Sequence, residues 1–213
     1  MAFISNTGPA AFKTDLEAIF ETLQQQRSDL LTMAGEVQLA ARLLALEEAR
    51  RLDASTNGDD VRIGRYIQAN EIMLRRVAAL DVEAQIAAIR VPPVTKTETL
   101  LQGRITDVAG KATAQLLVTL IDAAGTPVAG IPAALTDDSG YYAFILQPEQ
   151  IQALGANREL LLQIGNDSGK LVPAALKPFA LAAGQVSMIE TRLQAGELSQ
   201  LKLRTQLPRR EPS

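Results

Sequence analysis

Two adjacent prolines, Pro92 and Pro93, separate two stretches of sequence with different hydrophobic patterns. Proline has no backbone N–H to donate, and its ring disfavours helical backbone at the preceding residue. Before this point apolar residues recur at helical spacing, whereas after it short apolar runs alternate with turn residues. We therefore expect an α+β protein with a helical domain at residues 1–92, a β-rich domain at residues 93–196 and a tail at residues 197–213.

The helical domain is predicted to form two antiparallel helices. A seven-residue repeat runs through the first helix, about residues 11–54, at Leu16, Leu23, Leu30, Val37 and Leu44. The segment 54–60, Ala-Ser-Thr-Asn-Gly-Asp-Asp, is typical of a turn followed by a helix start. A second helix is expected at about residues 60–89, with an apolar face that includes Ile63, Ile67, Leu74 and Val77. The short connection makes the pair a coiled-coil-like hairpin.

Both helices also carry apolar residues outside these faces, including Ile19, Leu31, Leu39, Leu43 and Leu46 in the first and Ile72, Val82, Ile86 and Ile89 in the second. Each helix of a hairpin buries one stripe, so the other apolar positions need a further surface to cover them. Three surfaces would serve: a second copy, a protein partner or the β-rich domain. We favour a second copy or a partner. The predicted association core is Leu16, Leu23, Leu30, Val37, Leu44, Ile63, Ile67, Leu74 and Val77.

Asn70 lies in line with the apolar face of the second helix. A polar residue there either sets the register of the helix pair or is solvated at its periphery. The sequence leaves both interpretations open.

Residues 93–196 are predicted to form seven short strands separated by turns, at 100–106, 116–122, 130–136, 141–146, 159–164, 171–176 and 185–193. Seven strands in about 100 residues indicate an Ig-like β-sandwich. Residues 148–151, Pro-Glu-Gln-Ile, indicate one helical turn between strands. The tail is too apolar for a solvated segment, so we expect it to dock, for example on a partner, through Leu198, Leu201, Leu203 and Leu207.

The composition excludes the commonest catalytic devices. The 213 residues include no His and no Cys, so the usual zinc site, Ser-His-Asp triad, Cys-His pair or disulfide cannot form. A formal net charge of -3 argues against a nucleic-acid interface. Residues 1–10 lack the pattern of a secretory signal, and no run of about 18 apolar residues would span a membrane. We expect a cytoplasmic protein without membrane insertion, with export by a signal-less route left open.

Two segments carry weak signals of ligand chemistry. Gly103 and Gly110-Lys111 have the residue types of a phosphate-binding loop, but six residues lie between the glycines where that motif has about four. Asp137-Asp138-Ser139 offers oxygen ligands, yet one acidic turn cannot supply the roughly six to eight that Ca²⁺ takes. We therefore predict no catalytic residue, no cofactor and no metal site, and the chain is not expected to be an enzyme.

Two motifs resemble a known family of β-sandwich domains. Residues 103–111, Gly-Arg-Ile-Thr-Asp-Val-Ala-Gly-Lys, resemble the strand, Asp-containing turn and Gly that open carboxypeptidase-regulatory-like and Cna-B-like domains. Residues 136–144, Thr-Asp-Asp-Ser-Gly-Tyr-Tyr-Ala-Phe, resemble their Thr-Asp-x-x-Gly-x-Tyr/Phe-x-Phe turn and strand. The resemblance covers residues 97–195 and implies a prealbumin-like sandwich of the kind that serves as a structural, spacing or adhesive module. Ala112 and Ala114-Gln115 depart from the family pattern, and residues 1–92 carry no such resemblance.

These features predict a non-enzymatic structural or adaptor component of a larger assembly, which associates through its hairpin with a protein partner or with itself and presents a β-sandwich. The alternative is a binding module, multimerised by the helices, that recognises a glycan or peptide through the sandwich loops. Its candidate ligand contacts are Asp107, Asp137 and Tyr141. Side chains alternate along a strand, so Tyr142 and Phe144 are expected to enter the core, with Tyr141 on the opposite face.

Overall fold

A computed structural model describes residues 9–56, 60–155, 158–166, 171–172 and 177–201, with residues 9–17 and Val172 described by their backbone alone. Contacts divide the chain into two compact units, residues 1–88 and 89–213, and each is described by itself. The division lies close to Pro92 and Pro93.

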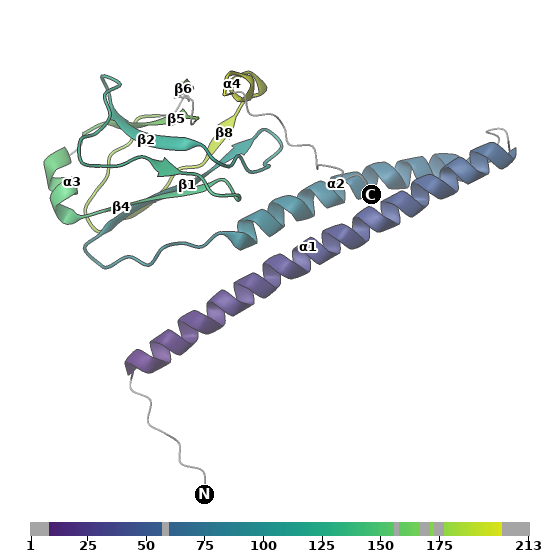
Figure 1. The fold of residues 1–213 in the computed structure, drawn as a ribbon, viewed down its shortest axis with the longest axis horizontal. Helices are drawn as coiled ribbons and strands as arrows, with labels where there is room; N and C mark the ends of the chain where they lie inside the picture. Colours follow the sequence, from purple (N-terminus) through teal and green to yellow (C-terminus); the bar gives the residue numbers. More distant parts are fainter. Residues whose placement is uncertain (1–8, 57–59, 156–157, 167–170, 173–176, 202–213) are drawn as a thin grey trace, which may run out of the picture. The chain divides into compact units, whose positions relative to one another are not determined.

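The first unit is an antiparallel helical hairpin (Figure 1), formed by α1 (Pro9–Thr56) and α2 (Val61–Ala88). Hydrogen bonds between the helices show this orientation, because residues later in α1 pair with residues earlier in α2. Ser28 Oγ donates to the Ala84 carbonyl over 3.4 Å, and Arg42 Nε donates to Asn70 Oδ1 over 2.8 Å. The predicted helix pair is confirmed.

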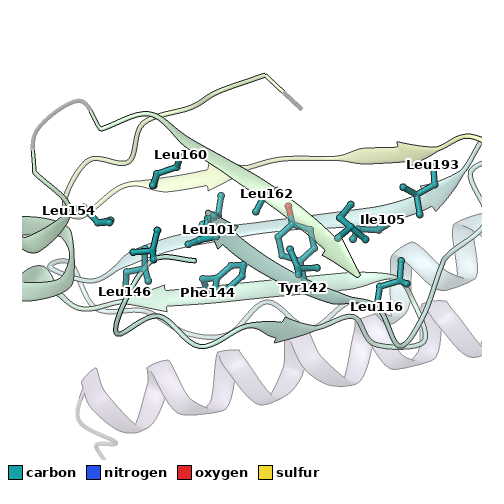
Figure 2. Close-up of a cluster of buried hydrophobic side chains, with 14 of the residues drawn as sticks. Leu101, Ile105, Leu116, Tyr142, Phe144, Leu146, Leu154, Leu160, Leu162 and Leu193 are labelled. Atoms are coloured by element: carbon teal, nitrogen blue, oxygen red, sulfur yellow. The ribbon is translucent and has the colours of Figure 1, made fainter. Parts of the chain in front are cut away.

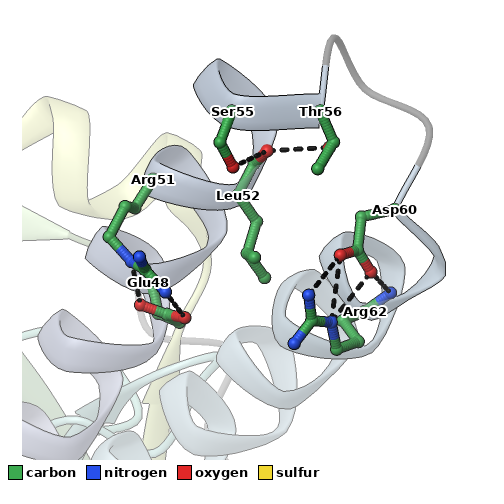
Figure 3. A network of polar contacts seen from close by, with 7 residues as sticks. All are labelled: Glu48, Arg51, Leu52, Ser55, Thr56, Asp60 and Arg62. Atoms are coloured by element: carbon green, nitrogen blue, oxygen red, sulfur yellow. Dashed lines mark hydrogen bonds and ion pairs between the residues drawn. The ribbon is translucent and has the colours of Figure 1, made fainter.

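Local side chains explain where one helix ends and the next begins (Figure 3). Asp60 directly precedes α2, and its Oδ1 accepts the backbone N–H of Arg62 at 2.8 Å, as an N-cap residue does. Near the end of α1 the carbonyls run out of helical N–H partners. There the hydroxyls of Ser55 and Thr56 donate to the carbonyl of Leu52, at 3.0 and 2.8 Å.

The second unit contains two four-stranded sheets, built from β1 (Thr99–Asp107), β2 (Leu117–Asp122), β3 (Ala134–Leu135), β4 (Tyr141–Leu146), β5 (Leu160–Gly165), β6 (Leu171–Val172), β7 (Val186–Met188) and β8 (Thr191–Leu193). Two short helices, α3 (Pro148–Leu154) and α4 (Ala195–Gln200), accompany them. In the mixed sheet, β1 lies antiparallel to β4 and parallel to β7 and β8. The other sheet is antiparallel, in the order β3-β2-β5-β6.

Both sheets contribute side chains to one hydrophobic core (Figure 2). Along β4 the side chains alternate as predicted: Tyr142, Phe144 and Leu146 are buried, whereas Ile145 is exposed. The rings of Tyr142 and Phe144 meet edge to face, with centroids 6.1 Å apart. The strands of the two sheets supply most of this core, through Leu101, Ile105, Val118, Leu120, Tyr142, Phe144, Leu146, Leu160, Leu162, Ile164 and Leu193.

Two predicted strands differ from the structure. The range 185–193 forms two strands, β7 and β8, rather than one. Between them the Ile189 N–H donates to the Gln102 carbonyl of β1 at 2.8 Å, whereas the Ile189 carbonyl accepts a hydrogen bond from the Tyr142 hydroxyl at 2.8 Å. The range 130–136 keeps strand structure only at Ala134–Leu135.

The start of the predicted tail packs against the second unit itself. Leu201 is 1% exposed, and its carbonyl accepts a hydrogen bond from Asn166 Nδ2 at 2.9 Å. Leu198 is half-buried against the same core. These two leucines therefore serve their own domain, and Leu203 and Leu207 lie outside the described residues.

Candidate functional site

The face of α1 toward α2 is made mainly of small and polar residues. We call it the inner seam; its members are at least half-buried and recur at steps of three and four, at Ser28, Leu31, Gly35, Gln38, Arg42, Ala45, Ala49, Leu52 and Thr56. This spacing is that of a coiled coil. Ser28 and Arg42 both make hydrogen bonds to α2, which identifies the seam as the side that meets α2.

The matching face of α2 carries larger side chains, at Ile63, Tyr66, Asn70, Met73, Val77, Leu80, Ala84 and Ala87. The hydrogen bonds pair Ser28 with Ala84 and Arg42 with Asn70, so the position midway between them brings Gly35 opposite Val77. Large residues of α2 thus lie against small ones of α1. Asn70 is half-buried and accepts from Arg42 across the seam, which is the arrangement of a polar residue that specifies register.

The predicted seven-residue repeat of α1 faces away from this seam. Leu30, Val37 and Leu44 each follow a seam residue by two positions, which is about 200° around an α-helix. We call this surface the outer stripe. Its large apolar side chains are between 54% and 73% exposed, at Ile19, Phe20, Leu23, Leu30, Met33, Val37 and Leu44. Leu16 belongs to the same register, but its side chain lies outside the described residues.

The sequence-based assignment of the inner face of α1 is therefore corrected. Leu31, which was expected outside the main stripe, lies half-buried in the inner seam. The Leu/Val repeat lies on the exposed face of α1 that points away from α2. On α2 the predicted association core divides in the same way. Ile63 and Val77 are half-buried in the seam, whereas Ile67 and Leu74 are 50% and 49% exposed.

The N-terminal part of α1 extends beyond the end of α2. In the register of the interhelical bonds, Ala88 at the end of α2 comes opposite Gln24. Helix α1 begins at Pro9, so it continues for roughly 20 Å past that point at 1.5 Å per residue. Residues 18–27 are exposed on every side of the helix, and they include the large apolar side chains of Ile19, Phe20 and Leu23. The outer stripe thus runs from this extension into the paired part of the hairpin.

The candidate ligand contacts Asp107 and Asp137 both cap tight turns. Asp107 Oδ1 accepts the backbone N–H groups of Ala109 and Lys111 at 2.8 and 2.9 Å. Asp137 Oδ1 likewise accepts those of Ser139 and Tyr141, both at 2.9 Å. These oxygens hold the turns, so they offer less to a ligand than free carboxylates would.

A third turn has the same design, and sequence reasoning did not single out the aspartate that caps it. Asp122 Oδ1 accepts the backbone N–H groups of Ala124 and Thr126 at 3.0 and 2.9 Å. The hydrogen bond from Thr126 does most to hold the pKa of the Asp122 carboxyl below its usual range. An Asp-x-x-Gly pattern that starts at residues 107, 122 and 137 could have identified all three capped turns. The glycine has a positive φ each time.

The third candidate contact, Tyr141, lies on the face of β4 opposite the core. It is half-buried, and its hydroxyl donates to Gln102 Oε1 at 2.7 Å. Burial and the nearby Asp137 carboxylate raise the pKa of Tyr141. The ring therefore supports its own sheet and keeps only part of its surface available for a ligand.

The described residues offer little for chemistry. A surface hollow is lined by Asp122, Ala123, Ala124, Arg158 and Glu159. The guanidinium group of Arg158 in this hollow forms an ion pair with Asp122, with 3.0 Å between Nη2 and Oδ2. Among the residues that the structure describes, no three acidic side chains gather closely enough to hold a metal ion, and no helix there is long and apolar enough to cross a membrane.

Comparisons with known proteins leave the family open. No protein-family model and no curated protein matches the chain. A phospholipase PlaB structure from Legionella pneumophila is similar over 67% of this chain, with 14% identity and a TM-score of 0.35. Chlorocatechol 1,2-dioxygenase from Pseudomonas putida is similar over 73% of this chain and 98% of its own, with 13% identity and a TM-score of 0.29. The chain spans about 37% of the PlaB chain, and likenesses this low carry no argument about function.

Proposed function

We propose that this chain is a non-enzymatic structural or adaptor component of a larger protein assembly, which associates through the outer stripe of its hairpin and presents the β domain. The observation that carries this proposal is the exposure of the stripe. Large apolar side chains scattered singly on a surface are ordinary, but a continuous row of them is typical of an interaction site.

The weakness of the inner seam supports the same proposal. In the described parts of α1 and α2, the buried apolar side chains are Ala49, Leu52 and Ala87, and they are 4% to 6% exposed. Burial of apolar surface is the main source of stability for a helix pair in water. A hairpin that buries so little and exposes a row of Leu, Ile, Met and Phe gains stability when another surface covers the row.

We further propose that the β domain is a prealbumin-like sandwich of the carboxypeptidase-regulatory-like or Cna-B-like kind. Two four-stranded sheets that share one core support this, as do the capped Asp-x-x-Gly turns at Asp107 and Asp137 in the two motifs that resemble that family. Such a domain suits a presenting or spacing role.

The alternative is a multimerised module that binds a glycan or peptide through the loops around Asp107, Asp137 and Tyr141. It has less support, because backbone N–H groups already bind one carboxylate oxygen, Oδ1, of each aspartate, and Gln102 accepts the tyrosine hydroxyl. Screening the full chain against a glycan array would favour this alternative if saturable binding is lost on Tyr141→Ala.

The proposed function is tested on the full chain with Leu30→Glu and the matched control Thr32→Glu. Both substitutions add one negative charge to an exposed position of α1, but Thr32 lies about 200° around the helix from Leu30. Light scattering measures self-association, and affinity purification from a native lysate measures association with other proteins.

We expect the parent and Thr32→Glu to associate, with themselves or with another protein, and Leu30→Glu to lose that association because a charge in an apolar contact is unfavourable. Circular dichroism checks that the helices persist. The proposal would be contradicted if the parent is a monomer and if it captures from the lysate no protein that Leu30→Glu fails to capture.

A further inference from the structure

We propose that the outer stripe of α1 binds the outer stripe of a second copy of this chain, so that two hairpins pair through their α1 helices. This inference rests on the proposed function and names the partner of the same surface. Four observations on the described residues carry it: the period of the stripe, its lack of charge, its area and its position relative to the inner seam.

The stripe has the period of a second coiled-coil seam. Leu23, Leu30, Val37 and Leu44 recur every seven residues, and Ile19 and Met33 fill positions between them at steps of three and four. A seven-residue apolar repeat keeps facing a partner helix when the two helices supercoil around each other. The required partner is therefore a helix with an apolar heptad stripe, and α1 of a second copy is one.

The central positions of the stripe are uncharged. From Ile19 to Leu44 the positions at this spacing that are not large and apolar are Gln26 and Ala40. Arg27, seven residues after Phe20, borders the stripe, and its Nη2 lies 3.6 Å from Glu83 Oε2 of α2. An acidic or basic partner surface would find no complementary charge there, whereas a second uncharged stripe leaves no charge buried without a partner.

The area is of the size that a stable pair needs. Seven large apolar side chains are each more than half exposed. At on the order of 100 Å² each they offer roughly 700 Å² per copy, close to the ~800 Å² per partner of a standard interface. The stripe from Ile19 to Leu44 is also about 40 Å long at 1.5 Å per residue, which suits side-by-side helices.

The two faces of α1 can be occupied together. Stripe residues lie about 200° around the helix from the seam residues two positions before them, so a second hairpin on the stripe does not displace α2. The stripe also continues past the end of α2, where residues 18–23 are exposed on all sides. A second copy would therefore cover the N-terminal extension of α1 that α2 does not reach.

The first test is the mass of the full chain in solution. We expect the parent and Thr32→Glu to show twice the mass of one chain by sedimentation or light scattering. Leu30→Glu should raise the dimer dissociation constant about a hundredfold or more, because a charge would enter an apolar contact. A parent that stays monomeric, or a Leu30→Glu dimer as tight as that of the parent, overturns the inference.

The second test uses the absence of cysteine from the chain, which makes any introduced cysteine the only thiol. Leu30 lies near the middle of the stripe, so Leu30→Cys should meet its copy and form a disulfide-linked dimer in either helix orientation. Thr32→Cys, on another face, is the matched control. Equal cross-linking of the two variants overturns the inference, and this readout does not depend on a destabilising substitution.

A third variant, Leu44→Cys, tells the orientation of the pair. Cross-linking at Leu44 as well as Leu30 indicates parallel α1 helices, and cross-linking at Leu30 alone indicates antiparallel ones. Either result supports pairing through the stripe. A monomeric parent that captures another protein only when the stripe is intact would overturn self-association and leave the proposed function standing, whereas a monomer with no stripe-dependent protein contradicts both.

Discussion

At the scale of single residues, Gly103 of β1 has no room for a side chain. A Cβ placed there would overlap the carbonyl of Ile189 and lie 2.6 Å from the Tyr142 hydroxyl oxygen. This is the point where the chain leaves β7 before entering β8, and where Tyr142 donates to Ile189. The buried tyrosine, the break in the last strand and the glycine therefore depend on one another.

We predict that Gly103→Ala lowers the free energy of unfolding of the β domain by about 3 kcal/mol or more, because backbone must move and the Tyr142 hydrogen bond is lost. Urea unfolding followed by tyrosine fluorescence measures this. Gly196→Ala is the control, since a Cβ there meets nothing within 4 Å. Equal stability of the two variants would show that the close approach at Gly103 is not maintained in solution.

The polar residues of the β domain also act locally. Asp107, Asp122 and Asp137 each accept hydrogen bonds from backbone N–H groups of their own turn, so one oxygen of each carboxylate has a structural role. The Tyr142 hydroxyl is buried against a backbone carbonyl, and burial raises the pKa of that group. It stays protonated as a hydrogen-bond donor.

At the scale of elements, the start of α2 depends on Asp60. The hydrogen bond from the Arg62 side chain and, next, that from the Arg62 backbone lower the pKa of Asp60 to about 2, from an ordinary value of 3.8. A carboxyl with a lower pKa in the folded state contributes stability above the unfolded value, and that contribution is lost as pH falls through the folded value.

We therefore predict that helix signal falls more steeply between pH 4 and pH 2 in the parent than in Asp60→Asn, which keeps a capping oxygen but does not titrate. Circular dichroism at a series of pH values measures the difference. Glu48 and other carboxyls with lowered pKa are common to both proteins, so subtraction removes their effect. Parallel acid transitions would rule out the proposed role of the Asp60 charge.

The helix pair shows what a repeat can and cannot predict. The length of α1 and the start of α2 after Asp60 follow from residue spacing and capping chemistry, and the structure confirms them. Spacing does not predict which face of α1 packs against α2, because α1 carries two stripes with a seven-residue repeat. The less apolar one meets α2, since small residues such as Gly35 and Ala49 leave room for the larger residues of α2. Hydrophobicity alone would predict that the outer stripe packs against α2.

At the scale of the whole molecule, each unit has its own interactions. The members of the hydrophobic core of the β domain lie between Leu101 and Leu201 in the sequence. The hydrogen bonds of Ser28 and Arg42 described above join α1 to α2. The contact division between residues 88 and 89 lies next to the two prolines. Along the chain, a helical hairpin and a packed β domain thus lie before and after a segment that cannot continue a helix.

We predict that a fragment of residues 89–213 folds without the hairpin, because its core is internal to that range. Its urea unfolding should be a single cooperative transition with a midpoint close to that of the β domain in the full chain. Leu101→Ala in the fragment serves as the positive control, with an expected loss of about 2–5 kcal/mol. A fragment without a cooperative transition would show that the β domain needs the hairpin.

The sequence by itself determined the elements of this protein. Proline placement, heptad spacing and Asp-x-x-Gly turns each act over a few residues, so the two helices, most strands and the buried face of β4 could be predicted. Only the tertiary structure decided which heptad of α1 meets α2, why β7 and β8 separate over Gly103, and that Leu198 and Leu201 belong to the β domain. These depend on how well side chains from distant segments fit each other, and that fit is not contained in the local pattern of either segment.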